Sequence, residues 1–191
     1  ISNHADRGSE CHRITRVGRG VGIEPVVMTE LAARVRFVAV GQHDPLAEPL
    51  LAELSVEYSG RYGGTAAQMR GWLDEHPADK FAPPDGGLLI GLLDGRPATG
   101  GAFQRFDAET AELKRIWTDS GHRQRGYAKV LLTELEAEIA RRGYRRVYLT
   151  TGNRQPEAEA LYMSAGYTRL AEPLPAQGMV FPIAFVKVFG A

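Results

Sequence analysis

The stretch from Asp119 to Lys129 has the composition of an anion-binding loop that runs into a helix. Arg123, Arg125 and Lys129 supply positive charge, and Gly126 lets the backbone pass close to a ligand. The first turn of a helix leaves its N–H groups without intrahelical acceptors, and the helix dipole favours negative charge there. The pattern indicates a pyrophosphate site, with an ordinary strand-to-helix loop as the alternative. A lone glycine with no following Gly-Lys-Ser/Thr argues against the dinucleotide and P-loop motifs.

The composition of the whole chain limits which other partners the protein could bind. Lys plus Arg and Asp plus Glu both number 23, so the formal net charge is zero and gives no electrostatic case for nucleic acid or an anionic membrane. Cys11 is the only cysteine, which rules out an intrachain disulfide and a multi-thiolate metal site. We therefore expect no metal. No apolar run approaches the roughly 18 residues of a membrane span, and the polar start resembles no secretory signal. A cytoplasmic location is expected.

Hydrophobic periodicity predicts the elements that position the loop. Residues 1–24 show no period and are predicted to be a polar N-terminal arm, followed by a domain over 25–191. A strand over 33–40 is expected to be mostly buried on both faces. Asp44-Pro45 predicts the start of one helix and Thr65 the cap of a second. Further strands are predicted at 88–92, 98–106, 109–118, 146–150, from 166 and within 180–189, with helices over 126–143 and 156–165, a turn at 83–87 and a hairpin at 94–97. This order predicts an α+β, or mixed α/β, fold.

Several of these segments match the motifs of one family in order and spacing. Arg123, Gly126 and Ala128 fit the pattern Arg/Gln, two residues, Gly, one residue, Gly/Ala, which is the acetyl-CoA motif of the GNAT superfamily of N-acetyltransferases. Residues 111–118 resemble the central strand of that family, and 154–167 resemble its final helix and the ending after it. The resemblance covers about 88–170. It implies a twisted, mostly antiparallel sheet flanked by about four helices, with strands 109–118 and 146–150 splaying apart to admit the cofactor.

The resemblance also implies a set of cofactor-binding residues. Backbone groups of Ile116, Trp117 and Thr118 would run along the pantetheine arm, where a backbone N–H stabilises the oxyanion. Gln155 would contact the same arm through its amide. The pyrophosphate would be held by the loop and the first helical turn, namely Arg123, Gln124, Arg125, Gly126, Tyr127, Ala128 and Lys129.

Two catalytic residues follow from the same resemblance. Tyr162 occupies the position that protonates the departing thiolate, and a tyrosine pKa of about 10 against a thiol pKa of about 8.5 makes this transfer undemanding. The alternative is a core tyrosine. Glu112 stands where histone-type relatives carry a general base. Strand alternation puts Glu112 and Lys114 on one face and Arg115 on the other, so an ion pair with Lys114 that is only structural is the alternative. A glutamate that another subgroup carries at the position of Thr150 is missing here.

The implied activity is transfer of an acetyl group from acetyl-CoA to a primary amine by direct attack in a ternary complex. The acceptor would be a small molecule or a protein lysine, and acetyl-CoA would be a co-substrate with no metal. Alternatives are another acyl-CoA, an O-acceptor, or a catalytically silent acyl-CoA-binding regulatory domain. Homodimerisation is common in the family, and the sequence leaves it open. The acceptor surface is expected from the first two helices and from loops 77–87 and 172–182, which carry Tyr58, Arg61, Tyr62, Trp72 and Phe81.

Overall fold

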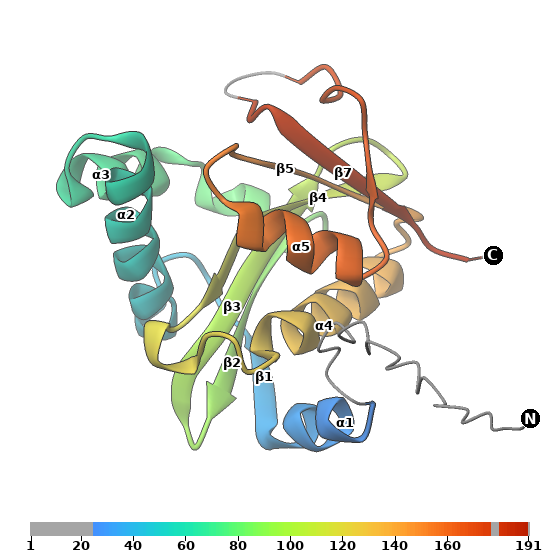
Figure 1. Cartoon of the computed structure of the whole chain (residues 1–191), viewed down its shortest axis with the longest axis horizontal. Helices are drawn as coiled ribbons and strands as arrows, with labels where there is room; N and C mark the ends of the chain where they lie inside the picture. The colour runs from blue at the N-terminus through green and yellow to red at the C-terminus, as the bar shows by residue number, and fades with distance from the viewer. Residues whose placement is uncertain (1–24, 177–179, 191) are drawn as a thin grey trace, which may run out of the picture.

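Seven strands form one sheet in the computed structural model, which describes residues 25–176 and 180–190 (Figure 1). The predicted arm over 1–24 lies outside the described residues. The sheet order is β1-β2-β3-β4-β5-β7-β6, and only β4 and β5 pair in parallel. The strands are β1 (Val35–Ala39), β2 (Gly87–Leu93), β3 (Arg96–Arg105), β4 (Thr110–Thr118), β5 (Arg146–Thr151), β6 (Thr168–Arg169) and β7 (Ile183–Val188).

Five α-helices accompany the sheet in the described part of the chain, against the predicted number of about four. They are α1 (Pro25–Arg34), α2 (Glu48–Tyr62), α3 (Ala66–Glu75), α4 (Tyr127–Arg141) and α5 (Pro156–Ser164), with short 3-10 turns η1 (Pro45–Ala47), η2 (Ala78–Phe81) and η3 (Ser120–His122). The additional helix is α1, to which the sequence prediction assigned no structure. The α+β class and the mostly antiparallel sheet are confirmed.

Local sequence chemistry accounts for several helix starts and turns. The side chain of Asp44 accepts a hydrogen bond from Leu46 N–H at the start of η1, and Pro45 is the first residue of that turn. Thr65 and Gln68 form a reciprocal capping box on α3. Asp94 and Gly95 have φ values of 50° and 80°, which suits the tight hairpin between β2 and β3. These predictions are confirmed.

Two apolar clusters lie on opposite faces of the sheet. One joins α4 and α5 to the sheet through residues such as Leu131, Leu135 and Phe185. The other joins α2 and α3 to it through residues such as Leu51 and Leu73. The sheet is thus the middle of three layers, and any channel from one face to the other has to pass through it.

The prediction that strand 33–40 is mostly buried on both faces is wrong. Val35 is buried, but Arg36 and Ala39 are exposed. The physical reason is that β1 is an edge strand, which pairs only with β2. Its β-branched composition predicted a strand correctly, whereas burial depends on neighbours that the local sequence does not specify.

Strands β4 and β5 pair over three residues and then part. The parallel register runs from Thr110–Arg146 to Glu112–Tyr148. Beyond Glu112 the rest of β4 has no partner strand on that side among the described residues, while β5 continues along β7. The predicted splay between these two strands is confirmed.

A β-bulge on the other side of β4 changes which side chains share a face. The register with β3 shifts between Gly100 and Ala102, and opposite this shift Arg115 has a φ of 59°. Arg115 therefore lies on the same side as Glu112 and Lys114, where it lines the same pocket. The prediction from strict alternation, which put Arg115 on the opposite face, is wrong because the extra residue breaks the period of two.

Candidate functional site

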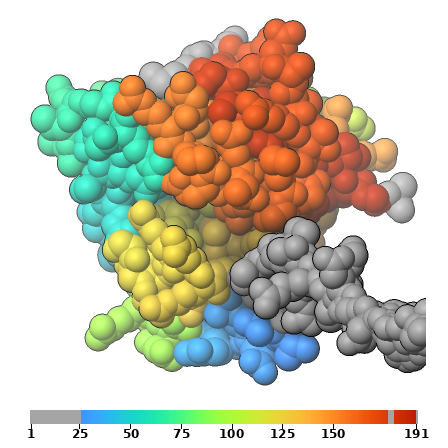
Figure 2. Space-filling view, in the orientation of Figure 1, coloured from blue at the N-terminus to red at the C-terminus, as the bar shows by residue number. Residues whose placement is uncertain are grey.

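The loop before α4 exposes backbone donors at the start of that helix. Gly126 caps α4 with a left-handed φ of 94°, a conformation that suits glycine. The first hydrogen bonds of the helix run from the N–H groups of Lys129 and Val130 to the carbonyl of Gly126, so the N–H groups of Tyr127 and Ala128 precede them. Figure 2 shows the segment around this loop (yellow) at the surface beside α5 (orange).

The cations of this loop have different surroundings. Arg123 is held by protein carboxylates, since its Nη2 lies 3.0 Å from Glu57 Oε2 and 3.6 Å from Glu53 Oε2. Arg125 and Lys129 take part in no ion pair within the described ranges. The loop therefore offers Arg125, Lys129 and the helix N-terminus to an anion, while Arg123 ties the loop to α2.

The side chains of the predicted central-strand residues contact other parts of the protein, whereas their backbone faces the split between β4 and β5. Trp117 is buried and donates from Nε1 to Glu53 Oε2 at 3.1 Å. Ile116 packs on the α4 side of the sheet, and Thr118 Oγ1 lies 3.3 Å from Thr99 Oγ1. Because these side chains have structural partners, a ligand in the split would meet the main chain of β4.

Tyr162 lies on α5 in the cluster that packs beneath α4. Its ring is 5.7 Å from both Tyr167 and Phe185, measured between ring centroids. Burial raises the pKa of Tyr162 well above its usual value, and the neighbouring Tyr58 adds to the rise. The phenol therefore stays protonated at neutral pH and is available as a proton donor.

Gln155 stands at the start of α5 with its amide already engaged. Its Oε1 accepts from Thr151 Oγ1 at 2.9 Å, and its Nε2 donates to Glu57 Oε1 at 3.4 Å. Glu57 also holds Arg123, so one carboxylate of α2 joins the loop before α4 to α5. The structure thus brings Gln155 and Arg123 together through a protein contact.

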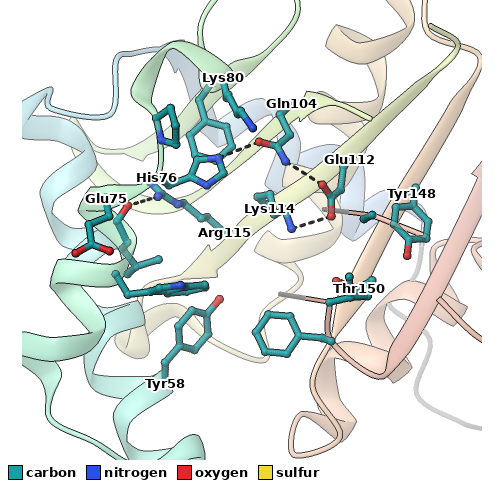
Figure 3. A pocket seen from close by; sticks show the side chains of 17 residues that line it. Tyr58, Glu75, His76, Lys80, Gln104, Glu112, Lys114, Arg115, Tyr148 and Thr150 are labelled. Atoms are coloured by element: carbon teal, nitrogen blue, oxygen red, sulfur yellow. Dashed lines mark hydrogen bonds and ion pairs between the residues drawn. The ribbon is translucent and has the colours of Figure 1, made fainter. Parts of the chain in front are cut away.

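A pocket of about 400 Å³ opens on the opposite face of the sheet, next to the split (Figure 3). Side chains from β4, β5, α2, α3 and the turn after α3 surround it. It is lined by Tyr58, Trp72, Leu73, Glu75, His76, Pro77, Lys80, Phe81, Gln104, Glu112, Lys114, Arg115, Tyr148, Thr150, Ala176, Val180 and Phe181. Of the residues expected at the acceptor surface, Tyr58, Trp72 and Phe81 line this pocket. Arg61 and Tyr62 do not.

Those two residues make other contacts. Arg61 bonds to the carbonyl of Arg154 and forms an ion pair with Glu157, which fixes the end of α2 to the start of α5. Tyr62 lies against Gly152, at whose α-carbon an added methyl group would overlap the phenol. Both residues therefore join α2 to the segment after β5.

Glu112 sits in the pocket wall with both carboxylate oxygens engaged. Lys114 Nζ lies 2.7 Å from Oε1, and Gln104 donates from Nε2 to Oε2 at 2.9 Å. The ion pair with Lys114 that the sequence suggested is present. A carboxylate offers about four lone-pair positions, so two donors leave capacity for a further proton or hydrogen bond.

The chain of bonds continues from Gln104 to His76. Gln104 Oε1 lies 2.9 Å from His76 Nε2, and because this oxygen can only accept, Nε2 must carry the proton. Burial lowers the pKa of His76, and the charges of Arg115, Lys80 and Lys114 lower it further. In Figure 3, dashed lines join His76 to Gln104, Gln104 to Glu112, and Glu112 to Lys114.

The sequence prediction missed Gln104 and His76. Gln104 lies directly opposite Glu112 in the β3–β4 register, so an exact hairpin alignment would have pointed to it. His76 ends α3 and reaches the site only through the packing of that helix, and no local pattern marks it.

No helix of the described ranges is long and apolar enough to cross a membrane. No group of three or more His, Cys, Asp or Glu side chains in those ranges is arranged to hold a metal ion.

Comparison with known proteins places this geometry in a family. The model of the acetyltransferase (GNAT) family matches residues 50–167. YsnE of Bacillus subtilis (strain 168), described as an uncharacterized N-acetyltransferase, is 34% identical over 80 residues. That match covers 41% of this chain and 52% of YsnE, so the chain spans about half the length of this curated relative.

Solved structures share the fold at low sequence identity. The proposed acyl-CoA N-acyltransferase of Klebsiella pneumoniae subsp. pneumoniae MGH 78578 superposes with a TM-score of 0.64 at 23% identity, over 82% of this chain and 98% of that one. The PaiA N-acetyltransferase of Thermoplasma acidophilum, solved in complex with coenzyme A, superposes with a TM-score of 0.62 at 16% identity, over 81% and 99%. The family match covers more than half of the sequence, and the chain belongs to the GNAT family of acetyltransferases.

Proposed function

We propose that this protein transfers an acetyl group from acetyl-CoA to a primary amine. The observation that carries the proposal is the split between β4 and β5 after Glu112, which lies between the open N-terminus of α4 and the pocket beside α2 and α3. Two substrates could meet there from opposite faces of the sheet. Membership of an acetyltransferase family and the coenzyme A bound to the PaiA protein support the choice of donor.

The residues around α4 fit the diphosphate of coenzyme A. The N–H groups of Tyr127 and Ala128 precede the first helical bond, and Arg125 and Lys129 add charge that no carboxylate of the described ranges neutralises. Helix N-termini and unpaired cations together favour such an anion. The unpaired edge of β4 beyond Glu112 offers backbone groups to the pantetheine arm, and one of its N–H groups would stabilise negative charge on the thioester oxygen.

In this proposal each face of the sheet supplies one residue that transfers a proton. The amine loses a proton as its nitrogen attacks the thioester carbonyl, and we assign that proton to Glu112 in the pocket wall. The carbon–sulfur bond then breaks, and Tyr162 donates its phenolic proton to the leaving thiolate. The raised pKa of Tyr162 keeps the phenol protonated at neutral pH, so its proton is in place when the carbon–sulfur bond breaks.

Thiol release from acetyl-CoA over a library of amines and lysine peptides tests the proposal. We expect saturable release with at least one acceptor, together with the acetylated amine by mass spectrometry. Binding of coenzyme A without transfer to any acceptor would favour a silent acyl-CoA-binding domain. Displacement of coenzyme A by ATP would instead indicate a nucleotide site at the loop before α4.

A further inference from the structure

The pocket beside the split carries more positive than negative charge. Lys80, Lys114 and Arg115 line it against the carboxylates of Glu75 and Glu112. Lys114 and Glu112 neutralise each other at 2.7 Å. In Figure 3, Glu75 lies at the far edge of the pocket and its carboxylate points away from Glu112 and Lys114. Lys80, which is exposed, and Arg115, which is buried, are therefore the pocket cations that form no ion pair within the described residues.

Arg115 is the more deeply placed of these cations. Its side chain is buried, and its guanidinium donates to Gln42 Oε1 at 2.9 Å and to the carbonyl of Leu73 at 2.5 Å. Both acceptors are neutral, and no carboxylate within the described ranges lies at ion-pair distance from it. Asp74, which pairs with Arg70, acts on this guanidinium only from beyond ion-pair distance, so an anion that reached this pocket would gain from the field of Arg115.

The same cations surround the ring of His76 in the pocket wall. After burial, the causes that lower the pKa of His76 include Arg115, Lys80 and Lys114, while its bond to Gln104 acts in the opposite direction. The same field would favour the neutral form of a bound amine over its ammonium. It would also attract an anionic group elsewhere on the same molecule.

Aromatic rings form the opposite wall of the pocket. Trp72 is 40% exposed, which is unusual for so large an apolar side chain. Its ring contacts Tyr58 edge to face, with centroids 6.3 Å apart. Phe181 lines the pocket beside them. An aromatic or large aliphatic group on the acceptor would cover this wall.

We propose that the acceptor is an amino-acid-like amine, which carries a carboxylate for the Lys80 and Arg115 side of the pocket and an aromatic or large apolar group for the Trp72 side. This substrate class rests on the proposed acetyl transfer. The formal net charge of the whole chain is zero and does not predict this substrate class, because the excess of positive charge is confined to one pocket. A polyamine is disfavoured, since its additional cations would meet the same field.

A two-by-two set of acceptors tests the assignment. Phenylalanine, phenylalaninol, alanine and alaninol vary the carboxylate and the ring independently on one scaffold. We expect kcat/KM for phenylalanine to exceed that for phenylalaninol by about tenfold or more at low salt, and the ratio to shrink as salt screens the charges. Alanine should be the poorer carboxylate-bearing acceptor. Equal or better rates with phenylalaninol would overturn the assignment while leaving acetyl transfer intact.

Variants of residues that line the pocket test whether the preference for an acceptor with a carboxylate and a ring arises there. Lys80→Met should lower the phenylalanine-to-phenylalaninol ratio several-fold, whereas Arg96→Met, on an exposed hairpin, should leave it unchanged. Trp72→Ala should lower the phenylalanine-to-alanine ratio, and Trp72→Phe should restore most of it. Unchanged ratios in Lys80→Met and Trp72→Ala would place the acceptor elsewhere.

A binding measurement covers the case in which no acceptor is acetylated. N-acetylphenylalanine should then bind at least about tenfold more tightly than N-acetylphenylalaninol in the presence of coenzyme A, followed by tryptophan fluorescence. That result would keep the carboxylate assignment and remove the proposed transfer. Equal affinities would overturn both the carboxylate assignment and the proposed transfer.

Discussion

Gln104 holds one carboxylate oxygen of Glu112 from the neighbouring strand, with 2.9 Å between Gln104 Nε2 and Glu112 Oε2. The two residues are direct partners in the β3–β4 register. Lys114 holds the other oxygen, so the orientation of this carboxylate is fixed by two donors before any substrate arrives. Such preorganisation suits a base that must point at a bound amine.

Replacing Glu112 by Gln tests whether this carboxylate takes the amine proton. We expect kcat to fall by about 10²- to 10⁴-fold, with little change in the KM for acetyl-CoA. Gln104→Leu should give a smaller loss and a shifted pH–rate profile, because the carboxylate keeps its charge but loses one positioning bond. Glu109→Gln, an exposed carboxylate beside β4, is the control. A Glu112→Gln enzyme with the wild-type rate and pH profile would mean that the pair with Lys114 is structural.

Tyr162→Phe should reduce turnover by about 10- to 100-fold without abolishing it, because water can protonate a thiolate slowly. The matched control is Tyr167→Phe, a buried tyrosine whose ring lies 5.7 Å from that of Tyr162. Steady-state kcat and thermal unfolding of both variants separate catalysis from packing. Equal rates in the wild type and Tyr162→Phe would refute the donor role.

Charge reversal at Arg125 should raise the KM for acetyl-CoA by about tenfold or more, since a cation at the helix N-terminus becomes an anion. Arg123→Gln should raise it less, because Glu57 and Glu53 already hold that guanidinium. Arg145→Glu, an exposed arginine beyond the other end of α4, is the control. A KM for Arg125→Glu equal to that of the control would show that the diphosphate binds elsewhere.

Gly126→Ala should destabilise the protein by about 1 to 2 kcal/mol, because the residue has a φ of 94°. Gly71→Ala is the opposite case, since this helical glycine has open space around an added methyl group and alanine favours the helix by up to about 1 kcal/mol. Urea unfolding measures both. A Gly126→Ala protein as stable as the wild type would show that the cap tolerates a side chain.

His76 should make stability depend on pH in a defined direction. Burial lowers its pKa in the folded protein below the ordinary histidine value of 6.5, so the unfolded chain binds the proton more tightly. The free energy of unfolding should therefore be highest above pH 6.5 and should fall as the pH drops from there through the folded-state pKa. Urea unfolding from pH 8 to pH 5 should show a smaller decrease in His76→Gln than in the wild type. A slope in His76→Gln identical to that of the wild type would exclude this contribution.

Much of the fold, and the geometry of the loop before α4, could be predicted because the responsible signals are local. Gly126 and the cations around it lie within one loop, and the caps at Asp44 and Thr65 act within a few residues of themselves. The period of α4 and the hairpin at Asp94-Gly95 are equally local. The motif order then gave the family, and through it the splay of β4 from β5.

The acceptor side depended on contacts between distant segments. Arg115 joined the pocket because one bulge broke the alternation of β4, and His76 reached Gln104 across 28 residues of sequence. Arg123 forms ion pairs with carboxylates of α2, which the sequence of the loop does not reveal. The sequence alone therefore determined the elements and the glycine-capped, basic loop before α4, because the interactions that form them act within a turn or two. Only the tertiary structure decided which charges are paired and which remain to meet a substrate, because pairing depends on how separate elements pack.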